Sequence, residues 1–390
     1  MPGAVGLEGK LKIRKGMRKL SKQNLEDMIM GCCYLGSGGG GSYDAGLKRI
    51  HDDLAAGLTF NLMSVDEMND DDYAATTYYV GSTAPYTPEQ RERFDKLPRI
   101  KEEATAVAFR LLQKYTGKNF VAVFAGEIGA GNTPYALSTA AHLGIAQLDA
   151  DTAGRAVPEI DQSTIFAAGI SLLPAAAATL FGDELLITKV ATPSREEEFL
   201  RIASTISMHI AAADSALPGK LLKQPNIVVQ GSLTLCEEIG KAYRLAVESH
   251  QDPVQAVIEA GKGYKLFSGQ VCNYDWADKG GYLVGDVEIT GSGRYQGQKY
   301  RLAYKNENMI SWRDGKVSVT CPDIITMVAT ATGKAILNPD FEKGQEVIII
   351  GLPAPAPWRT PAGLKVCGPA HFGYDASYIP IEERHRSGNI

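Results

Sequence analysis

Residues 119–151, "NFVAVFAGEIGAGNTPYALSTAAHLGIAQLDAD", contain the pattern that decides the fold class. The stretch opens on a short, continuous apolar run, 119–126, which is typical of a strand buried on both faces of a parallel sheet. A glycine-containing loop and a helical segment follow, and 144–151 supplies a second strand. Strand, loop, helix and strand in this order predict an α/β layer architecture.

The same alternation extends toward the N-terminus, with a strand expected at 73–80 and a helix at 101–115. Farther along the chain the pattern changes to helices and to short strands separated by Gly and Asn turns. We therefore expect an α/β domain with a mostly parallel sheet over 20–188. We expect a C-terminal α+β domain over 189–385, with a mainly β part at 266–351.

Composition narrows the class of protein. The chain has 390 residues, 44% hydrophobic and 22% charged, which allows two domains and a large core. A net charge of −5 and a pI of about 5.8 argue against a nucleic-acid partner. Six Cys without a CxxC pair, and no secretory apolar segment at the start, predict a cytoplasmic protein. The most apolar stretch, 165–181, is broken by Gly169 and Pro174, so we expect no membrane span. A homo-oligomer is the default expectation for a metabolic enzyme.

The first candidate site is the glycine loop in "LGSGGGGSYDAG" (35–46). Glycine lets the backbone approach a ligand, and the N–H groups that open the following helix attract anions. The loop lacks the GK[ST] ending of a nucleotide-binding P-loop. We expect it to bind a phosphate or a substrate carboxylate, and a simple flexible turn is the alternative. The residues concerned are Gly38, Gly39, Gly40 and Gly41.

The second candidate site follows the strand at 119–126. Glu127 comes directly after this strand, and α/β sheets present chemistry at the carboxyl ends of their strands. Asn132 and Thr133 are candidates for substrate or anion binding, and either one can cap the next helix, with Pro134 in its first turn. Capping explains Asn132 but leaves Glu127 unexplained, so Glu127 is expected to be functional.

The third candidate site is "QLDADTAGRAVPEIDQST" (147–164). Asp149 and Asp151 lie two apart, so an extended strand points both to one face. Their repulsion raises one pKa unless Arg155 or a metal ion neutralises the pair. This arrangement suits a general acid and base or a divalent cation, and Glu159 is counted with it. An Asp-rich turn held by Arg155, with Glu159 in solvent, is the alternative.

Three further groups of residues are weaker indications of a functional site. Cys33 suits either a nucleophile, a soft metal ligand or an ordinary buried thiol. The six His show no HxH or HExxH spacing, so a zinc site must be assembled from distant segments, and His371 is the one to test. Asn306, Glu307 and Asp323 fall at the edges of expected β-turns, and turn chemistry accounts for them.

Three motifs in this order resemble the S-methyl thiohydantoin desulfurase family, whose genes often lie beside hydantoinase and oxoprolinase genes. The resemblance covers the chain from about residue 24 to 384. The motifs are "LGSGGGG" (35–41), "GEIGAGNTPYAL" (126–137) and "LDADTAGRAVPE" (148–159), supported by "KNEN" (305–308), "CPDIIT" (321–326) and "GPAHFGYD" (368–375).

The resemblance implies hydrolysis of a C–S bond on a carboxylate-bearing S-methyl thiohydantoin ring, which releases the hydantoin and methanethiol. For that reaction we expect Asp149 or Asp151 to be the base and Glu127 its partner. Arg155 then neutralises the cluster or grips the substrate carboxylate, and the glycine loop binds the other anionic end. Whether a divalent metal such as zinc takes part is open, and the sequence favours no nucleotide.

Two other functions remain open. A nucleotide-dependent hydantoinase- or oxoprolinase-type amidohydrolase component would use the glycine loop for phosphates, although that loop contains no Lys. A non-catalytic subunit would bind a hydantoin-like ligand for a hydantoinase-type partner enzyme.

Overall fold

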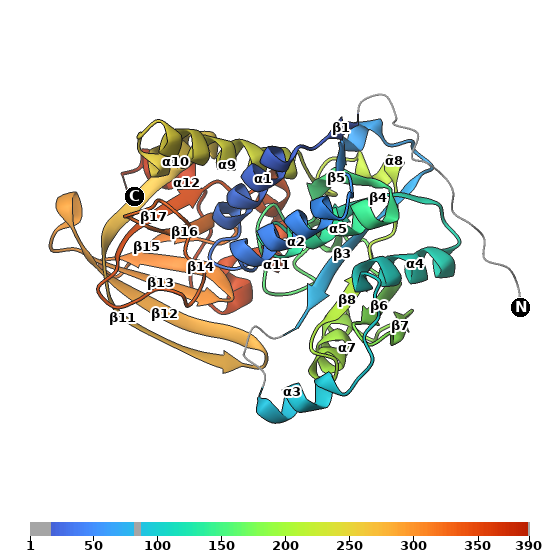
Figure 1. Cartoon of the computed structure of the whole chain (residues 1–390). Coiled ribbons are helices and arrows are strands. Elements are labelled where there is room, and N and C mark those ends of the chain that lie inside the picture. The colour runs from blue at the N-terminus through green and yellow to red at the C-terminus, as the bar shows by residue number, and fades with distance from the viewer. Residues whose placement is uncertain (1–16, 82–86, 389–390) are drawn as a thin grey trace, which may run out of the picture.

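Two β-sheets organise the computed structural model, which describes residues 17–81 and 87–388 (Figure 1). A ten-stranded sheet is formed by strands from the first 230 residues, and a seven-stranded sheet by strands from 264–352. Helices cover the first sheet and fill the space between the two sheets. The architecture is mixed α/β, as the sequence predicts.

The centre of the ten-stranded sheet is parallel. Its neighbouring strands are β2 (Asn61–Met63), β5 (Ala146–Asp151), β4 (Phe120–Ala125) and β3 (Tyr73–Val80). Helices α4 (Ala104–Thr116) and α5 (Asn132–Leu143) make the crossovers that parallel strands require. The outer strands pair antiparallel and are β1 (Arg18–Lys19), β6 (Ala175–Thr179), β7 (Glu184–Ile187), β8 (Ile210–Ala213), β9 (Leu217–Pro218) and β10 (Val229–Gln230).

The central strands form where the sequence is apolar on both faces. Five of the six residues of β4 are buried, and the whole strand lies between β3 and β5. The strand expected at 73–80 is confirmed as β3, with the same bounds. The carboxyl ends of β3, β4 and β5 therefore meet at one edge of the sheet.

The seven-stranded sheet is antiparallel throughout. It curls until β14 and β15 approach β16, and it encloses its own apolar core around Phe267, Tyr300 and Ile349. In spatial order its strands are β15 (Lys316–Thr320), β14 (Glu307–Arg313), β13 (Lys299–Lys305), β12 (Tyr282–Gly291), β11 (Tyr264–Lys279), β17 (Glu346–Leu352) and β16 (Ile324–Ala329).

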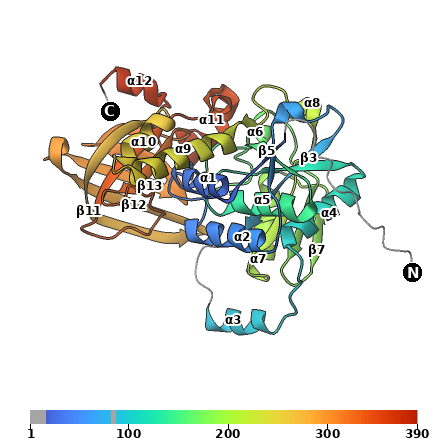
Figure 2. The same cartoon turned by 45° about the horizontal axis from the view of Figure 1, so that its top comes forward.

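A helical layer joins the two sheets. Helix α1 (Lys22–Leu35) packs on α9 (Ser232–Glu248) with the backbones in contact, because a Cβ at Gly31 or Gly240 would lie 1.8 Å from a carbonyl oxygen of the facing helix. Both helices share one core with residues of β16 and β17, and α9 and α10 lie along the seven-stranded sheet in both views (Figures 1 and 2). The other helices are α2 (Tyr43–Ala55), α3 (Pro88–Asp95), α6 (Thr164–Ala167), α7 (Ser194–Thr205), α8 (Gly219–Leu222), α10 (Pro253–Ala260), α11 (Pro361–Cys367) and α12 (Ile381–Arg386).

The apolar stretch at 165–181 does not form one long helix. It contains the short helix α6 and the strand β6, whose five residues are all buried within the first sheet. Within 17–81 and 87–388, no helix has both the length and the hydropathy needed to cross a lipid bilayer.

Candidate functional site

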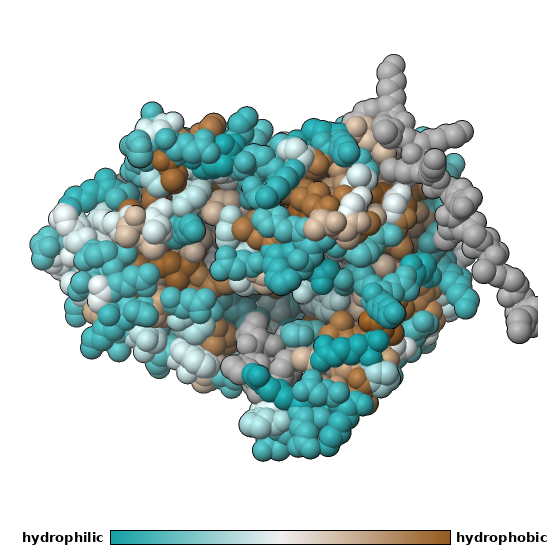
Figure 3. All heavy atoms as spheres, in the orientation of Figure 1, coloured by the Kyte–Doolittle hydropathy of each residue, from teal (hydrophilic) through white to brown (hydrophobic). Residues whose placement is uncertain are grey.

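A cavity of about 810 Å³ lies between the two sheets. Its walls come from the glycine loop, the loops that follow β3 and β4, the segment 157–163 and the starts of β12 and β14. The face drawn in Figure 3 is hollowed between the two halves of the molecule. Segments far apart in the sequence therefore build one site at the carboxyl edge of the parallel strands.

The glycine loop forms one wall by packing its backbone against the loop after β4. Gly40 has a φ of +75°, and a Cβ there would lie 2.6 Å from the Cα of Gly129. The N–H of Gly131 donates to the carbonyl of Gly40 at 2.7 Å. The two loops approach this closely only because both consist of glycine at the contact.

The same loop also holds a carboxyl group. A Cβ at Gly39 would lie 2.0 Å from Oε1 of Glu307, and the N–H of Gly40 is hydrogen-bonded to the Glu307 side chain. All four glycines, Gly38 to Gly41, line the cavity. Their expected role in binding an anion stays a prediction, because one face of the loop is already occupied by Glu307.

Glu127 lies in the loop where the sequence places it, two residues after the end of β4 and on the cavity wall. Its Oε1 accepts a hydrogen bond from Asn132 Nδ2 at 2.7 Å, and its Oε2 accepts one from the Val157 N–H at 2.7 Å. Burial raises the pKa of Glu127 to about 7, although these hydrogen bonds and the charge of Arg155 act in the opposite direction. A carboxyl group with this pKa exchanges protons readily near neutral pH.

The capping role expected for Asn132 or Thr133 is wrong. Gly131 occupies the N-cap position of α5, and no side chain caps the helix. Asn132 instead lines the cavity and orients Glu127, while its Oδ1 accepts a hydrogen bond from the Tyr79 N–H at 3.2 Å. Thr133 is fully buried behind the wall, where its hydroxyl donates to the Glu127 carbonyl at 3.3 Å.

Glu307, the first residue of β14, is the second carboxyl group of the wall. It is 4% exposed, and its Oε2 accepts no hydrogen bond within the part of the chain that the structure describes. Burial raises its pKa well above the ordinary value, and the nearby charge of Glu127 raises it further. Two buried carboxyl groups that repel each other disfavour ionisation of both at once, so such a pair suits a reaction that needs an acid and a base.

Asp149 and Asp151 lie elsewhere. Both face the first turn of α9, as their spacing predicts, but neither lines the cavity. Asp149 accepts hydrogen bonds from the N–H groups of Leu233 at 3.1 Å and Thr234 at 3.0 Å, so it caps α9 from a neighbouring strand.

Asp151 is fully buried and holds the turn that follows it. Its Oδ2 accepts hydrogen bonds from the N–H groups of Ala153 at 2.9 Å and Gly154 at 2.6 Å. Burial raises its pKa to about 7, with a small contribution from Glu127. The expected repulsion by Asp149 is therefore not what shifts the pKa of Asp151.

Arg155 does not neutralise the two aspartates. It is fully buried, and its guanidinium donates to the backbone carbonyls of Pro322 at 3.0 Å, Asp323 at 3.1 Å and Asn308 at 3.2 Å. Three of its hydrogen bonds thus tie the first half of the chain to the second sheet. Its charge also lowers the pKa values of Glu127 and Glu307 from a distance.

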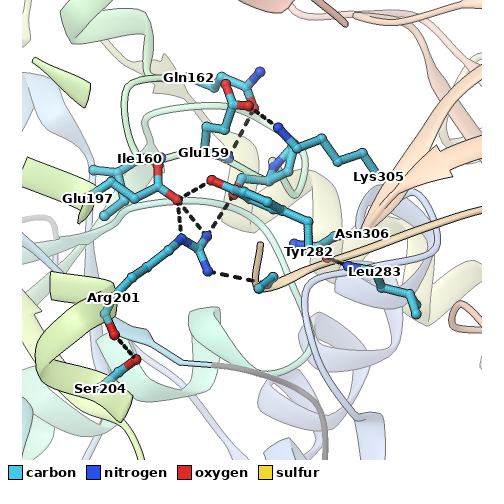
Figure 4. A network of polar contacts seen from close by, with 12 residues as sticks. Glu159, Ile160, Gln162, Glu197, Arg201, Ser204, Tyr282, Leu283, Lys305 and Asn306 are labelled. Carbon is cyan, nitrogen blue, oxygen red and sulfur yellow. Dashed lines mark hydrogen bonds and ion pairs between the residues drawn. The ribbon is translucent and has the colours of Figure 1, made fainter. Parts of the chain in front are cut away.

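Glu159 lines the cavity as an ion-paired group. It pairs with Lys305 and accepts a hydrogen bond from Nε2 of His371 at 2.7 Å (Figure 4 shows the Lys305 contact). Burial alone would raise its pKa, but these two partners lower it to about 2. A carboxylate this acidic is poorly suited to exchange protons near neutral pH.

A network of polar contacts beside Glu159 fastens the β11–β12 hairpin to α7 (Figure 4). Arg201 lies 4.3 Å from the centre of the Tyr282 ring and donates to Glu197 at 2.6 Å. The Tyr282 hydroxyl donates to the same Glu197 oxygen at 2.6 Å, and Lys305 lies over the other side of the ring at 4.0 Å. The hairpin thereby closes one side of the cavity.

A third buried carboxyl group also lines the cavity. Asp214 follows β8, is 2% exposed, and accepts hydrogen bonds from the hydroxyl groups of Thr76 and Tyr78. Burial raises its pKa. Sequence reasoning missed Asp214, although it is an acidic residue directly after an apolar strand. Glu307 begins a strand instead of following one, and turn chemistry is a sufficient explanation for it in the sequence.

The described residues offer no ready metal site. No group of three or more His, Cys, Asp or Glu among them is arranged to hold a metal ion. The Cys33 thiol donates to the Ile29 carbonyl, and burial raises its pKa, which disfavours a nucleophilic thiolate. His371 is held by Glu159.

Comparison with known proteins covers nearly the whole chain. The family model described as the S-Me-THD-like N-terminal domain matches residues 23–189, and the S-Me-THD-like C-terminal domain matches 192–381. A crystal structure of a protein from Chromobacterium violaceum, a Northeast Structural Genomics Consortium target, is 24% identical with a TM-score of 0.71, over 93% of this chain and 100% of that chain. This likeness shows the fold alone. None of the curated proteins matches the sequence.

Proposed function

Because the chain belongs to the S-Me-THD-like family, we propose that it is a hydrolase that removes an S-methyl substituent from a small hydantoin-like ring. The products are the hydantoin and methanethiol. The observation that carries the proposal is the pair of carboxyl groups, Glu127 and Glu307, on one cavity wall with both pKa values raised.

In the first step water adds to the ring carbon that bears the sulfur. The water oxygen bonds to this carbon and its proton passes to the Glu127 carboxylate. At the same time the Glu307 carboxyl protonates the ring nitrogen of the C=N bond. The result is a tetrahedral centre that carries a hydroxyl group and the S-methyl group.

In the second step the C–S bond breaks. Methanethiolate leaves and takes the proton held by Glu127, while the hydroxyl on the ring carbon returns a proton to Glu307 and becomes the carbonyl. Both carboxyl groups regain their starting states. Positioned proton transfers of this kind are worth about 100- to 10,000-fold each, which gives both residues a measurable role.

The test is a free-thiol assay on an S-methylated thiohydantoin. We expect Glu127→Gln and Glu307→Gln each to lower kcat/KM by at least about 100-fold. Glu259→Gln, the same change at an exposed position on α10, is the control and retains activity. In the unsubstituted protein kcat/KM rises with pH through about 7, as Glu127 loses its proton, and falls again when Glu307 does.

Two results would contradict the proposal. One is undiminished thiol release in both carboxyl variants. The other is a ring that binds without releasing thiol in the unsubstituted protein, which would instead indicate a ligand-binding subunit.

A further inference from the structure

Trp276 on the β11–β12 hairpin combines two properties that are unusual together. The residue is 52% exposed, although tryptophan is on average highly buried in folded proteins. It also lines the cavity. We propose that the indole of Trp276 stacks on the face of a planar, conjugated substrate ring and determines how tightly this ring is bound. The inference rests on the proposed function for the identity of the ring.

The other two tryptophans of the chain have structural partners. Trp358 is fully buried, and its indole N–H donates to the carbonyl of Ala153 at 2.6 Å. The ring of Trp312 packs under the guanidinium of Arg301, 4.7 Å from the ring centre. Within the described residues, the indole of Trp276 has neither a hydrogen-bond partner nor an aromatic or cationic neighbour. Its ring face is therefore available to a ligand.

The register of the hairpin turns Trp276 toward the cavity. Side chains alternate between the two faces of a strand, so Trp276 shares its face with Tyr274 and Asp278. Tyr274 packs on Phe341, a residue of the apolar core that the second sheet encloses, with 5.1 Å between ring centres. Asp278 lines the cavity. Trp276 thus lies between the end of this core and the cavity wall.

The strand that carries Trp276 is held on both sides. The residue opposite Trp276 on β12 is Gly285, and a Cβ there would lie 2.5 Å from the Tyr304 hydroxyl. Because that side chain is absent, Tyr304 reaches across β12 and donates to the Asp275 carbonyl at 3.5 Å. Tyr282 fastens the end of the hairpin to α7, toward which the hairpin extends in Figure 1. A ring contact on a strand held in this way loses little conformational entropy on binding.

The wall formed by the hairpin is continuous with the wall that carries Glu307. Leu283, which pairs with Asp278 across the hairpin, also lines the cavity. The Leu283 N–H donates to Asn306 Oδ1 at 2.9 Å, and the Asn306 N–H donates to the Leu283 carbonyl at 2.7 Å. Asn306 directly precedes Glu307. The aromatic surface of Trp276 and the acid of the proposed reaction therefore belong to one connected part of the site.

Aromatic stacking suits the ring of the proposed substrate. Conjugation of the N=C–S unit and of the ring carbonyl with the ring nitrogens keeps this ring nearly flat, so it presents a π face as a nucleic-acid base does. An aromatic side chain on such a face strengthens binding by about tenfold or more. The ring stays in place while one of its carbons becomes tetrahedral, so we expect the contact to act on KM and to leave kcat nearly unchanged.

The experiment measures binding of a hydantoin with a carboxylate substituent, the product of the proposed reaction, by calorimetry on the full chain. Trp276→Leu keeps an apolar side chain without a flat ring and should raise Kd by at least about tenfold. Trp276→Phe keeps a smaller flat ring and should raise Kd by only about threefold. Trp312→Leu, the same change at a tryptophan outside the cavity, is the control and should leave Kd unchanged.

Two further measurements separate stacking from a merely structural role. In the thiol assay on the S-methylated ring, Trp276→Leu should raise KM by about tenfold and change kcat by less than about twofold. Binding of the hydantoin should also change the tryptophan fluorescence of the unsubstituted protein. This change should disappear in Trp276→Phe, because Trp312 and Trp358 lie outside the cavity.

Unchanged hydantoin affinity in Trp276→Leu would overturn the inference. Equal losses of affinity in the Leu and Phe variants, once circular dichroism shows that both fold, would overturn it as well, and so would a fluorescence change that persists in Trp276→Phe. Binding and thiol release separate this inference from the proposed function. Binding that depends on Trp276 without thiol release overturns the reaction alone, and thiol release with an unchanged KM in Trp276→Leu overturns the inference alone.

Discussion

At the scale of single residues, Gly40 and Gly57 show that a positive φ is only one of the reasons why a position requires glycine. Their φ values are +75° and +83°, so both disfavour an L side chain by a similar amount. A Cβ at Gly57 would meet nothing within 4 Å, whereas at Gly40 it would lie 2.6 Å from the Gly129 Cα. The glycine loop thus requires glycine for contact as well as for conformation.

We therefore predict different costs for the same substitution. Gly57→Ala should lower the free energy of unfolding by about 1–2 kcal/mol, the cost of the backbone conformation. Gly40→Ala should cost at least about 2 kcal/mol more, because two loops must move apart. Urea denaturation of both variants measures the difference, and equal losses would contradict the close contact between the loops.

Single residues also show which parts of the site can be predicted from the sequence. Glu127 was predictable because it follows a buried strand whose carboxyl end must face a site. In the sequence, turn chemistry explains Glu307, since a polar residue beside a turn needs no other explanation and its burial depends on the distant glycine loop. The sequence predicts a cap at Asn132 and cannot reveal its contact with Glu127, because this contact depends on the loop geometry.

At the scale of elements, α9 takes its N-terminal hydrogen bonds from a neighbouring strand. The N-cap residue of the helix is Gly231, which has no side chain to offer. Asp149 of β5 accepts the hydrogen bonds in its place. Because the acceptor belongs to a strand, it fixes the position of the helix relative to the sheet. It also accepts hydrogen bonds from the N–H groups in the first turn of the helix.

This geometry gives a prediction that separates stability from catalysis. Asp149→Ala should lower the free energy of unfolding by about 1–2 kcal/mol, and Asp149→Asn by about half as much, because an amide oxygen still accepts. Thiol release should persist in both variants, since Asp149 lies outside the cavity. Thermal unfolding and the thiol assay together test the prediction, and a 100-fold loss of activity in Asp149→Asn would return Asp149 to the catalytic site.

The β11–β12 hairpin is a second case in which one element positions another. Its docking on α7 depends on Tyr282, whose hydroxyl donates to Glu197. Tyr274 lies on the same hairpin, and its hydroxyl has no hydrogen-bond partner within the described residues, so it provides a matched control.

We predict that Tyr282→Phe loosens the hairpin. Loss of this hydrogen bond should raise KM by about 3- to 10-fold with little change in kcat, because the cavity wall is displaced but Glu127 and Glu307 remain. Hydrogen exchange should become faster in 276–284. Tyr274→Phe should change neither quantity, and equal effects of the two variants would show that the hydroxyl of Tyr282 does not fasten the hairpin.

At the scale of the whole molecule, buried carboxyl groups make stability depend on pH. The pKa of Asp151 is about 7 in the folded chain against an ordinary 3.8. Between these values the folded chain holds a proton that the unfolded chain has released. The free energy of unfolding therefore decreases as the pH rises through this window.

Asp151→Asn tests the sign of this dependence. The amide still accepts from the N–H groups of Ala153 and Gly154 but cannot ionise. We expect the unfolding free energy of the unsubstituted protein to fall by up to about 4 kcal/mol between pH 4 and 8 on account of this group. Urea denaturation across that range should give a flatter profile for the variant, and parallel profiles would show that Asp151 titrates normally.

Local sequence pattern predicts the parts of the fold better than their assembly. Alternating strands and helices up to residue 151, and the strand-rich pattern at 266–351, were readable because periodicity and turn residues are local signals. The curl of the second sheet and its contact with the first sheet could not be predicted in this way. Arg155 shows why, since three of its hydrogen bonds go to backbone carbonyls more than 150 residues away, and every residue type has such a carbonyl.

The division of the site between distant segments has a consequence for synthesis. Glu127 is made 180 residues before Glu307, so at about 5–20 residues per second roughly ten seconds or more separate them on the ribosome. Throughout that interval the nascent chain has one carboxyl group of the pair and an unfinished wall. On the proposed function, the chemistry therefore begins only after the second half of the chain is made, and a gene split between the two halves would yield two products that each lack one carboxyl group of the pair.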